Sequence, residues 1–192
     1  MAASASDFTQ IREIRDNIVI LNDGGMRVLL SSSSINLSLK GEDEQMSIIT
    51  GFQNFLNSLD FNIQIFMQSK RLDIRNYINL LKSREQDVKE DLLKIQIKEY
   101  IKFIQKFIDE QNIMTKSFYI VVPYNIPSIT DSVSKISDSE FLKSQNQLMQ
   151  RVSIVISGLI PLGLKVNILN TEELIPLFYK LYNPGELNSP TQ

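Results

Sequence analysis

The longest part of the chain without a helix-breaking residue is residues 73–112, forty positions that contain neither proline nor glycine. One continuous helix of that length would be a rod of about 60 Å, which is longer than a domain of this size. Its apolar stripe also pauses, because Val88 is the single apolar residue across 83–91. The pattern therefore predicts one long helix that either bends at the pause or projects its middle into solvent. We expect this helix to be a contact element.

Turn residues and hydrophobic periodicity predict the other elements. Short β-prone runs on both sides of Asn22-Asp23-Gly24-Gly25 indicate a β-hairpin, since these residues tolerate the positive φ of a tight turn. Further strands are expected at 62–68, 117–122 and 164–169, and further helices at 42–59, 141–159 and 171–182. The strand at 62–68 should bury the face of Ile63, Ile65 and Met67. The strand at 117–122 should be central.

The resulting order, ββαβαβαβα, predicts the fold class. It indicates an α/β (α+β-like) protein with a mixed sheet of about five strands, right-handed crossovers and helical cover. The length of 192 residues fits one ordinary domain, which we assign to residues 10–185. Residues 1–9 and 186–192 are expected to be disordered tails, and 125–139 a polar loop. The stretch 152–169 is long enough to span a bilayer, but Pro161 and Gly163 interrupt it and favour a helix end, a turn and a strand.

The sequence lacks the residues that several kinds of catalytic and binding site require. There is no cysteine and no histidine, which removes thiolate catalysis, the Ser-His-Asp arrangement and the commonest transition-metal ligands. No glycine pattern for binding phosphates or dinucleotides occurs either. The net charge of -2 gives no basic field for nucleic acid. We therefore expect no cofactor, no metal and no nucleic-acid partner.

The remaining catalytic patterns favour structural explanations. Ser132 and Lys135 match Ser-x-x-Lys, but they fall in a polar loop where a lysine would not be desolvated enough to act as a base. The acidic clusters at 42–44 and 172–173 lie at predicted helix starts, where the helix dipole accounts for them. No catalytic residue is predicted, and we expect a protein that is not an enzyme.

Four lysines form the most distinctive candidate site. Lys94, Lys98, Lys102 and Lys106 are spaced four apart, so a helix would align them into a slowly turning stripe. Pairing of Glu90 with Lys94 and of Glu99 with Lys102 would make this an ordinary solvated face. The alternative is that the stripe binds an acidic partner or an anionic membrane surface.

Several stretches together resemble a known family: EIRDNIVILNDGGMRVLL followed by INLSLKGEDEQ, then FQNFLNSLDFNIQIFMQSKRLDI, then IQIKEYIKFIQKFI with NIMTKSFYIVVPY. They resemble the TraC-like domain, which is similar to the N-terminal domain of the conjugative, type IV secretion ATPases. The resemblance covers about residues 10–185 and rests on diffuse hydrophobic and turn patterns. It carries no functional residue over, because the P-loop motor domain of those ATPases has no counterpart in this sequence. The chain would then be a stand-alone paralogue, a split subunit or a piece of a longer protein.

The resemblance implies a cytoplasmic module, at most peripheral at the inner membrane, that docks with a P-loop secretion motor ATPase or other subunits of the apparatus. Self-association is a further expectation. Two rival readings stay open: a general soluble adaptor or structural protein unrelated to secretion, and an enzyme that uses only Ser, Lys, Tyr and carboxylates.

Overall fold

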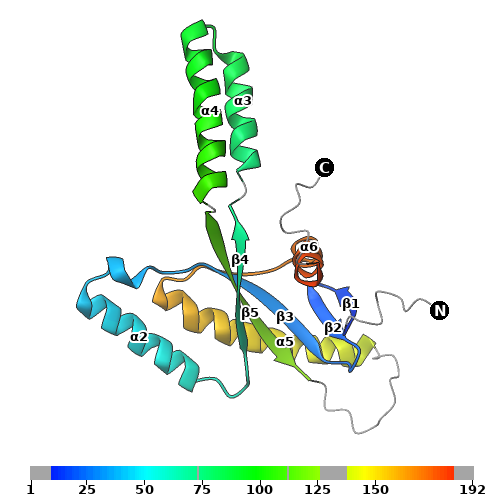
Figure 1. Ribbon diagram of the computed structural model, residues 1–192. Helices are drawn as coiled ribbons and strands as arrows, with labels where there is room; N and C mark the ends of the chain where they lie inside the picture. The colour runs from blue at the N-terminus through cyan, green and yellow to red at the C-terminus, as the bar shows by residue number, and fades with distance from the viewer. Residues whose placement is uncertain (1–9, 73, 112, 126–137, 184–192) are drawn as a thin grey trace, which may run out of the picture. The chain divides into compact units, whose positions relative to one another are not determined.

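The computed structural model describes residues 10–72, 74–111, 113–125 and 138–183 (Figure 1). Within these residues the chain divides into two units. The first consists of Met1–Met67 with Ser117–Asn183, and the second of Gln68–Lys116, each as far as it is described. Two neighbouring strands connect the units, because each begins in one of them and ends in the other.

Two tight turns start the sheet of the first unit. Strand β1 (Ile11–Arg15) leads to β2 (Ile18–Leu21) through Asp16 and Asn17, both of which have positive φ, 52° and 64°. Such a pair of positive φ values matches the twist of the flanking strands. Strand β3 (Met26–Ser32) then follows the predicted turn, in which Gly24 has φ 81° and the Asp23 carboxylate accepts a hydrogen bond of 2.8 Å from the Gly25 N–H.

Among the described residues, the sheet has six strands, in the order β1-β2-β3-β5-β4 with β6 (Val166–Ile168) also paired to β3. Strand β4 is Gln64–Arg71 and β5 is Met114–Tyr124. The sheet is antiparallel. The chain reverses direction between β4 and β5, so these two strands become neighbours without a parallel crossover.

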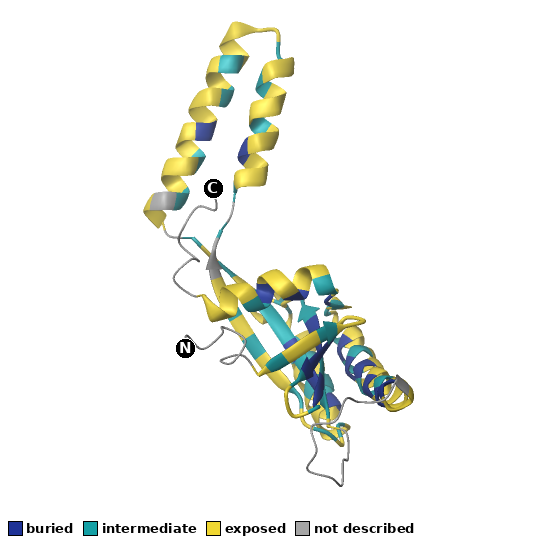
Figure 2. Cartoon of the chain, turned by 90° about the vertical axis from the view of Figure 1, so that its right-hand side faces the viewer, coloured by how far each residue is buried: buried dark blue, intermediate teal, exposed yellow. Residues whose placement is uncertain are grey.

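Helices cover both faces of this sheet, because side chains of β2 and β3 alternate between two apolar cores. On one face, Ile18, Ile20 and Val28 pack with α2 (Glu42–Asn57) and α5 (Asp138–Leu159). On the other, Val19 and Leu29 pack with α6 (Thr171–Tyr182). Short 3-10 helices lie at Leu37–Leu39 (η1) and Ile160–Leu162 (η2). Figure 2 shows the buried residues concentrated on the strands and on α5.

The second unit is a helical hairpin of α3 (Arg75–Asp87) and α4 (Asp91–Gln111), which lie side by side (Figures 1 and 2). Val88, between them, has extended backbone angles and ends the first helix. Chain reversal at this point lets the apolar stripes of the two halves pack on each other. The polar stretch 83–91, where the stripe pauses, therefore lies at the closed end of the hairpin.

The fold class is confirmed: the chain is a mixed α/β protein with a helix-covered sheet. Several expectations within it were wrong. The sheet is antiparallel rather than mixed, β1 was not predicted, and the long helix is two helices rather than one. The β4 face was also wrong, since Ile65 and Met67 are about half exposed whereas Phe66 stacks on Tyr119 with ring centroids 5.0 Å apart.

Other expectations have separate outcomes. The stretch 152–169 consists of the end of α5, the turn at η2 and strand β6, as predicted. In the part of the chain that the structure describes, no helix has the length and apolarity to cross a membrane. The expected tails 1–9 and 186–192 and the loop residues 126–137 lie outside the described residues. The assignment of 10–185 to one domain stays a prediction.

Candidate interaction surfaces

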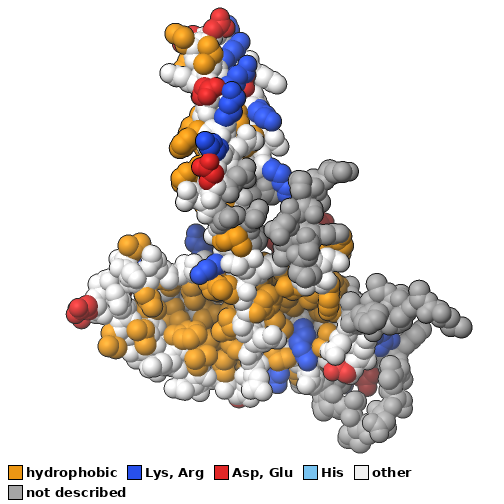
Figure 3. All heavy atoms as spheres, in the orientation of Figure 1, with side chains coloured by type: hydrophobic (Ala, Val, Ile, Leu, Met, Phe, Trp, Pro, Cys, Tyr) orange, Lys and Arg blue, Asp and Glu red, His pale blue; other side chains and the backbone are white. Residues whose placement is uncertain are grey.

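The four candidate lysines, Lys94, Lys98, Lys102 and Lys106, all lie on α4. Because an α-helix turns every 3.6 residues, a spacing of four makes the stripe rotate slowly around the helix. Lys94 is half-buried and the other three are exposed. Figure 3 shows Lys and Arg side chains gathered along the hairpin. The structure therefore brings the predicted stripe together on one helix.

Most of this stripe is paired with acids of the same hairpin. Lys98 Nζ lies 3.5 Å from Glu85 Oε1 on α3, Lys102 Nζ lies 2.9 Å from Glu99 Oε1, and Lys106 Nζ lies 3.7 Å from Glu110 Oε1. The pair of Lys102 with Glu99 was predicted. The contact of Glu90 with Lys94 is a backbone hydrogen bond, in which the Lys94 N–H donates to the Glu90 carbonyl over 3.2 Å. Exposed pairs of this kind contribute about 0–1 kcal/mol each. Binding of a partner by the stripe stays a prediction.

The hairpin is held together by a seam of isoleucine and leucine side chains. Ile78 on α3 and Ile101 on α4 are 5% and 7% exposed, and they are the residues of the described part of the second unit that are buried. Half-buried apolar residues extend the seam at alternating spacings of three and four: Ile74, Leu81, Ile97, Ile104 and Ile108. This is the heptad pattern of two helices packed along their length.

A second apolar row runs beside this seam. Leu93, Tyr100 and Phe107 lie seven residues apart on α4, and each is between 42% and 47% exposed. Tyr77 on α3 belongs to the same side of the hairpin, because its hydroxyl lies 3.4 Å from that of Tyr100. We call these four residues the side row. The rings of Phe103 and Phe107 stack 6.0 Å apart at its end.

The contact between the two tyrosines affects the ionisation of Tyr77. The hydrogen bond with Tyr100 raises the pKa of Tyr77 above 10.0, burial and the charge of Tyr100 raise it further, and the charge of Arg84 opposes the shift. Arg84 lies seven residues after Tyr77 on α3, and residues seven apart lie on nearly the same side of a helix. Arg84 therefore extends the side row toward the closed end of the hairpin.

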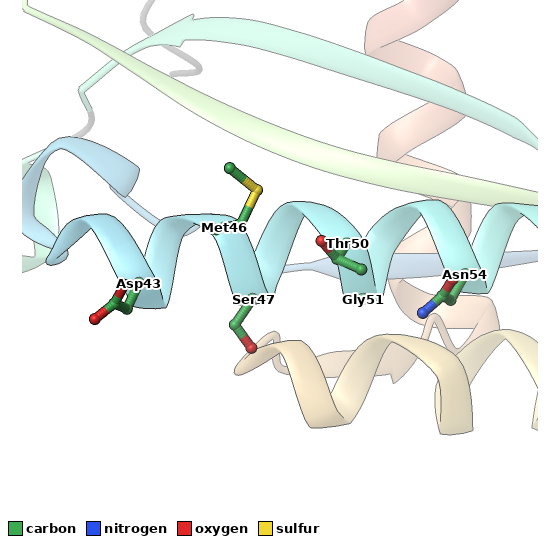
Figure 4. Close-up of a pocket in the computed structure, with 6 residues that line it drawn as sticks. All are labelled: Asp43, Met46, Ser47, Thr50, Gly51 and Asn54. Atoms are coloured by element: carbon green, nitrogen blue, oxygen red, sulfur yellow. The ribbon is translucent and has the colours of Figure 1, made fainter.

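The first unit also exposes apolar side chains. Leu39, Met46, Ile65 and Met67 are all at least 50% exposed, and Figure 3 shows hydrophobic side chains spread over this unit. A shallow hollow lies on α2, lined by Asp43, Met46, Ser47, Thr50, Gly51 and Asn54 (Figure 4). A single helix supplies all of these residues, and Asp43 is the one ionisable group among them. The hollow thus lacks the facing acid–base groups that catalysis requires.

The other chemical candidates remain apart. Glu42, Asp43 and Glu44 lie in the first turn of α2, and Glu172 and Glu173 in the first turn of α6, as predicted for helix starts. Ser132 and Lys135 lie outside the described residues. Among those described, no cluster of acidic side chains is arranged to hold a metal ion.

Comparison with known proteins gives one match. A family model described as the archaeal TraC-like domain matches residues 12–184, a range that extends over both units. No curated protein matches the chain.

Proposed function

Because this chain belongs to the archaeal TraC-like domain family, which links it to conjugation or secretion systems, we propose that it is a non-catalytic assembly module of a type IV secretion or conjugation-like apparatus. In this role it docks with the P-loop motor ATPase of that apparatus or with its other subunits. The family match carries the proposal, since it extends over nearly all of the described residues.

The surface of the protein supports a role in binding other proteins. Exposed large hydrophobic side chains are present on α2 and β4 in the first unit and on α4 in the second. Exposed apolar surface is typical of sites that bind other proteins. The hairpin also differs in charge from the whole chain. Residues 68–116 hold eleven Lys or Arg and eight Asp or Glu, although acids exceed bases in the full sequence. The hairpin therefore suits a partner that combines apolar and acidic side chains.

We further propose that the chain leaves ATP hydrolysis to its partner. Its sequence contains no Gly-x-x-x-x-Gly-Lys-Ser/Thr, the loop whose backbone amides and lysine hold the phosphates in P-loop ATPases. The proposed location is the cytoplasm, with at most a peripheral contact with the inner membrane through its partners.

Affinity capture of the full chain from its native host tests the proposal. The membrane and soluble fractions are analysed separately by mass spectrometry, and the expected result is recovery of a P-loop secretion motor in the membrane fraction. A variant with Lys94, Lys98, Lys102 and Lys106 changed to Gln removes the positive charges without placing like charges beside Glu85, Glu99 and Glu110. We expect it to recover less motor while its circular dichroism stays unchanged.

The matched control changes four lysines elsewhere, Lys40, Lys143, Lys165 and Lys180, to Gln. It removes the same charge from the first unit and should recover the motor normally. Equal loss in both variants would contradict a specific role of the stripe. Recovery of the wild-type chain without any secretion subunit would contradict the proposal and favour a general adaptor.

A further inference from the structure

We propose that two copies of this chain associate through their helical hairpins, so that α3 and α4 of both copies form an antiparallel four-helix bundle. The side row of Tyr77, Leu93, Tyr100 and Phe107 would lie in its interior, with Tyr100 at the two-fold axis. This inference rests on the hairpin alone and does not depend on the proposed role in secretion.

The hairpin by itself leaves most of its large apolar side chains exposed. In the described part of 68–116, Ile78 and Ile101 are buried. The exposed large hydrophobic residues are Tyr77, Leu80, Leu92, Leu93, Ile95, Tyr100, Phe103, Phe107 and Met114. Two helices that pack only on each other require two apolar positions per heptad. Helix α4 has a third, occupied by Leu93, Tyr100 and Phe107, and this wider apolar face is typical of helices in larger bundles.

The side row of α4 is spaced symmetrically about Tyr100. Leu93 and Phe107 lie seven residues to either side of Tyr100, on the same side of α4. A two-fold axis through Tyr100 and perpendicular to the helix would place Leu93 opposite Phe107 of the partner at both ends. The same surface would then serve both copies, as symmetric dimer interfaces require. A large and a smaller apolar side chain would face each other at each end.

The charges at the two ends of the hairpin favour an antiparallel arrangement of the two copies. Arg84, seven residues after Tyr77 on α3, extends the side row at the closed end of the hairpin, and Glu110 lies at the opposite end of α4. An antiparallel arrangement brings Arg84 of each copy to the end where the partner's Glu110 lies. A parallel arrangement would instead bring the two Arg84 side chains together, which is unfavourable. Glu110 Oε1 lies 3.7 Å from Lys106 Nζ, and both side chains are exposed, so the Glu110 carboxylate is accessible at the surface.

Cysteine cross-linking tests this arrangement, because the chain has no cysteine of its own. Three single variants of the full chain are compared: Tyr100→Cys, Leu93→Cys and Phe107→Cys. The reagent is a short bis-maleimide whose reach matches the distance of about 8–10 Å between packed helices. We expect Tyr100→Cys to give a covalent dimer. Leu93→Cys and Phe107→Cys should give none separately, because like positions would be about 21 Å apart at 1.5 Å per residue.

The decisive sample is a mixture of the Leu93→Cys and Phe107→Cys chains, which should cross-link to each other. Cross-linking of Leu93→Cys with itself would show a parallel arrangement and overturn the proposal. Ile95→Cys, an exposed position outside the side row, is the control and should stay uncross-linked.

Sedimentation of the unmodified chain gives an independent measurement. We expect a concentration-dependent dimer, a monomer for Tyr100→Glu, and a dimer for Ile95→Glu with equal helix content in all three. If the purified chain stays monomeric at every concentration and no cysteine variant cross-links, the proposal is wrong and the side row binds a different helix. That result would not contradict the binding of a secretion motor, which the affinity capture tests separately.

Discussion

Replacement of Ile101 by Ala should destabilise the hairpin locally and leave the stability of the helix-covered sheet unchanged. Ile101 is 7% exposed and forms the seam together with Ile78. Removal of a buried Ile side chain costs about 2–5 kcal/mol, and the lower value applies where neighbours can collapse into the space. The seam is open along its side, so we expect a loss of about 2 kcal/mol.

Hydrogen exchange followed by mass spectrometry measures this loss region by region. A loss of about 2 kcal/mol corresponds to an increase of about 30-fold in the exchange rate of the protected amides of α3 and α4. Amides of β3, β5 and α5 should exchange at their wild-type rates, because the hairpin is a separate unit. The control, Ile95→Ala, alters a residue that is 56% exposed and should change the rates little. Faster exchange spread equally over both units would show that the hairpin and the sheet do not lose stability separately.

Three further predictions concern single contacts. Asn170→Ala removes the capping box of α6, where the Asn170 side chain accepts from the Glu173 N–H over 2.9 Å, and should lower the unfolding free energy by about 1 kcal/mol in urea titrations; an unchanged midpoint would contradict it. Gly158→Ala would drive its new methyl group into the ring of buried Phe55 and should cost about 1–3 kcal/mol, whereas Gly41→Ala, with no atom within 4 Å, should cost much less. Because the pKa of Tyr77 is raised in the folded chain, the unfolded chain loses this proton first as pH rises, so the hairpin should lose stability above the ordinary tyrosine pKa of 10.0. Thermal melts of α-helical signal at rising pH should show a weaker decline for Tyr77→Phe, and an identical decline would argue against the effect.

Local patterns in the sequence predicted most of the individual elements. The turn at Gly24, the helix start at Glu42 and the helix at Thr171–Tyr182 all follow from nearby residues, and all are confirmed. The sequence also contains a local turn pattern that predicts strand β1. Asp16-Asn17 separates IREIR from IVIL by two residues that tolerate positive φ, which is typical of a tight hairpin.

The elements that were predicted incorrectly depend on contacts distant in the sequence. Alternation in β4 separates Ile65 from Phe66, but which face is covered depends on neighbouring strands and helices that are remote along the chain. The pause at 83–91 marks a change in the long helix, yet it holds no glycine or proline to distinguish a bend from a reversal. The packing of α3 on α4, which buries Ile78 and Ile101, makes the reversal favourable.

On the hairpin too, local spacing predicted the position of side chains but not their contacts. Spacing of four placed Lys94, Lys98, Lys102 and Lys106 on one helix, and this placement is confirmed. The ion pair of Lys98 with Glu85 required the hairpin, so the sequence did not indicate it. The side row could have been found, because Leu93, Tyr100 and Phe107 repeat every seventh residue. The exposure of these three side chains could not have been predicted, because it depends on how many helices pack together.

The proposed docking role is tested most directly by a binding titration between the purified full chain and the purified P-loop motor ATPase proposed as its partner, with ATP hydrolysis followed in the same samples. We expect saturable binding that weakens when the four lysines of α4 are changed to Gln, and no ATP hydrolysis by the chain without the motor. Absence of binding at every concentration, or hydrolysis that stays with the chain through rigorous purification, would contradict this expectation.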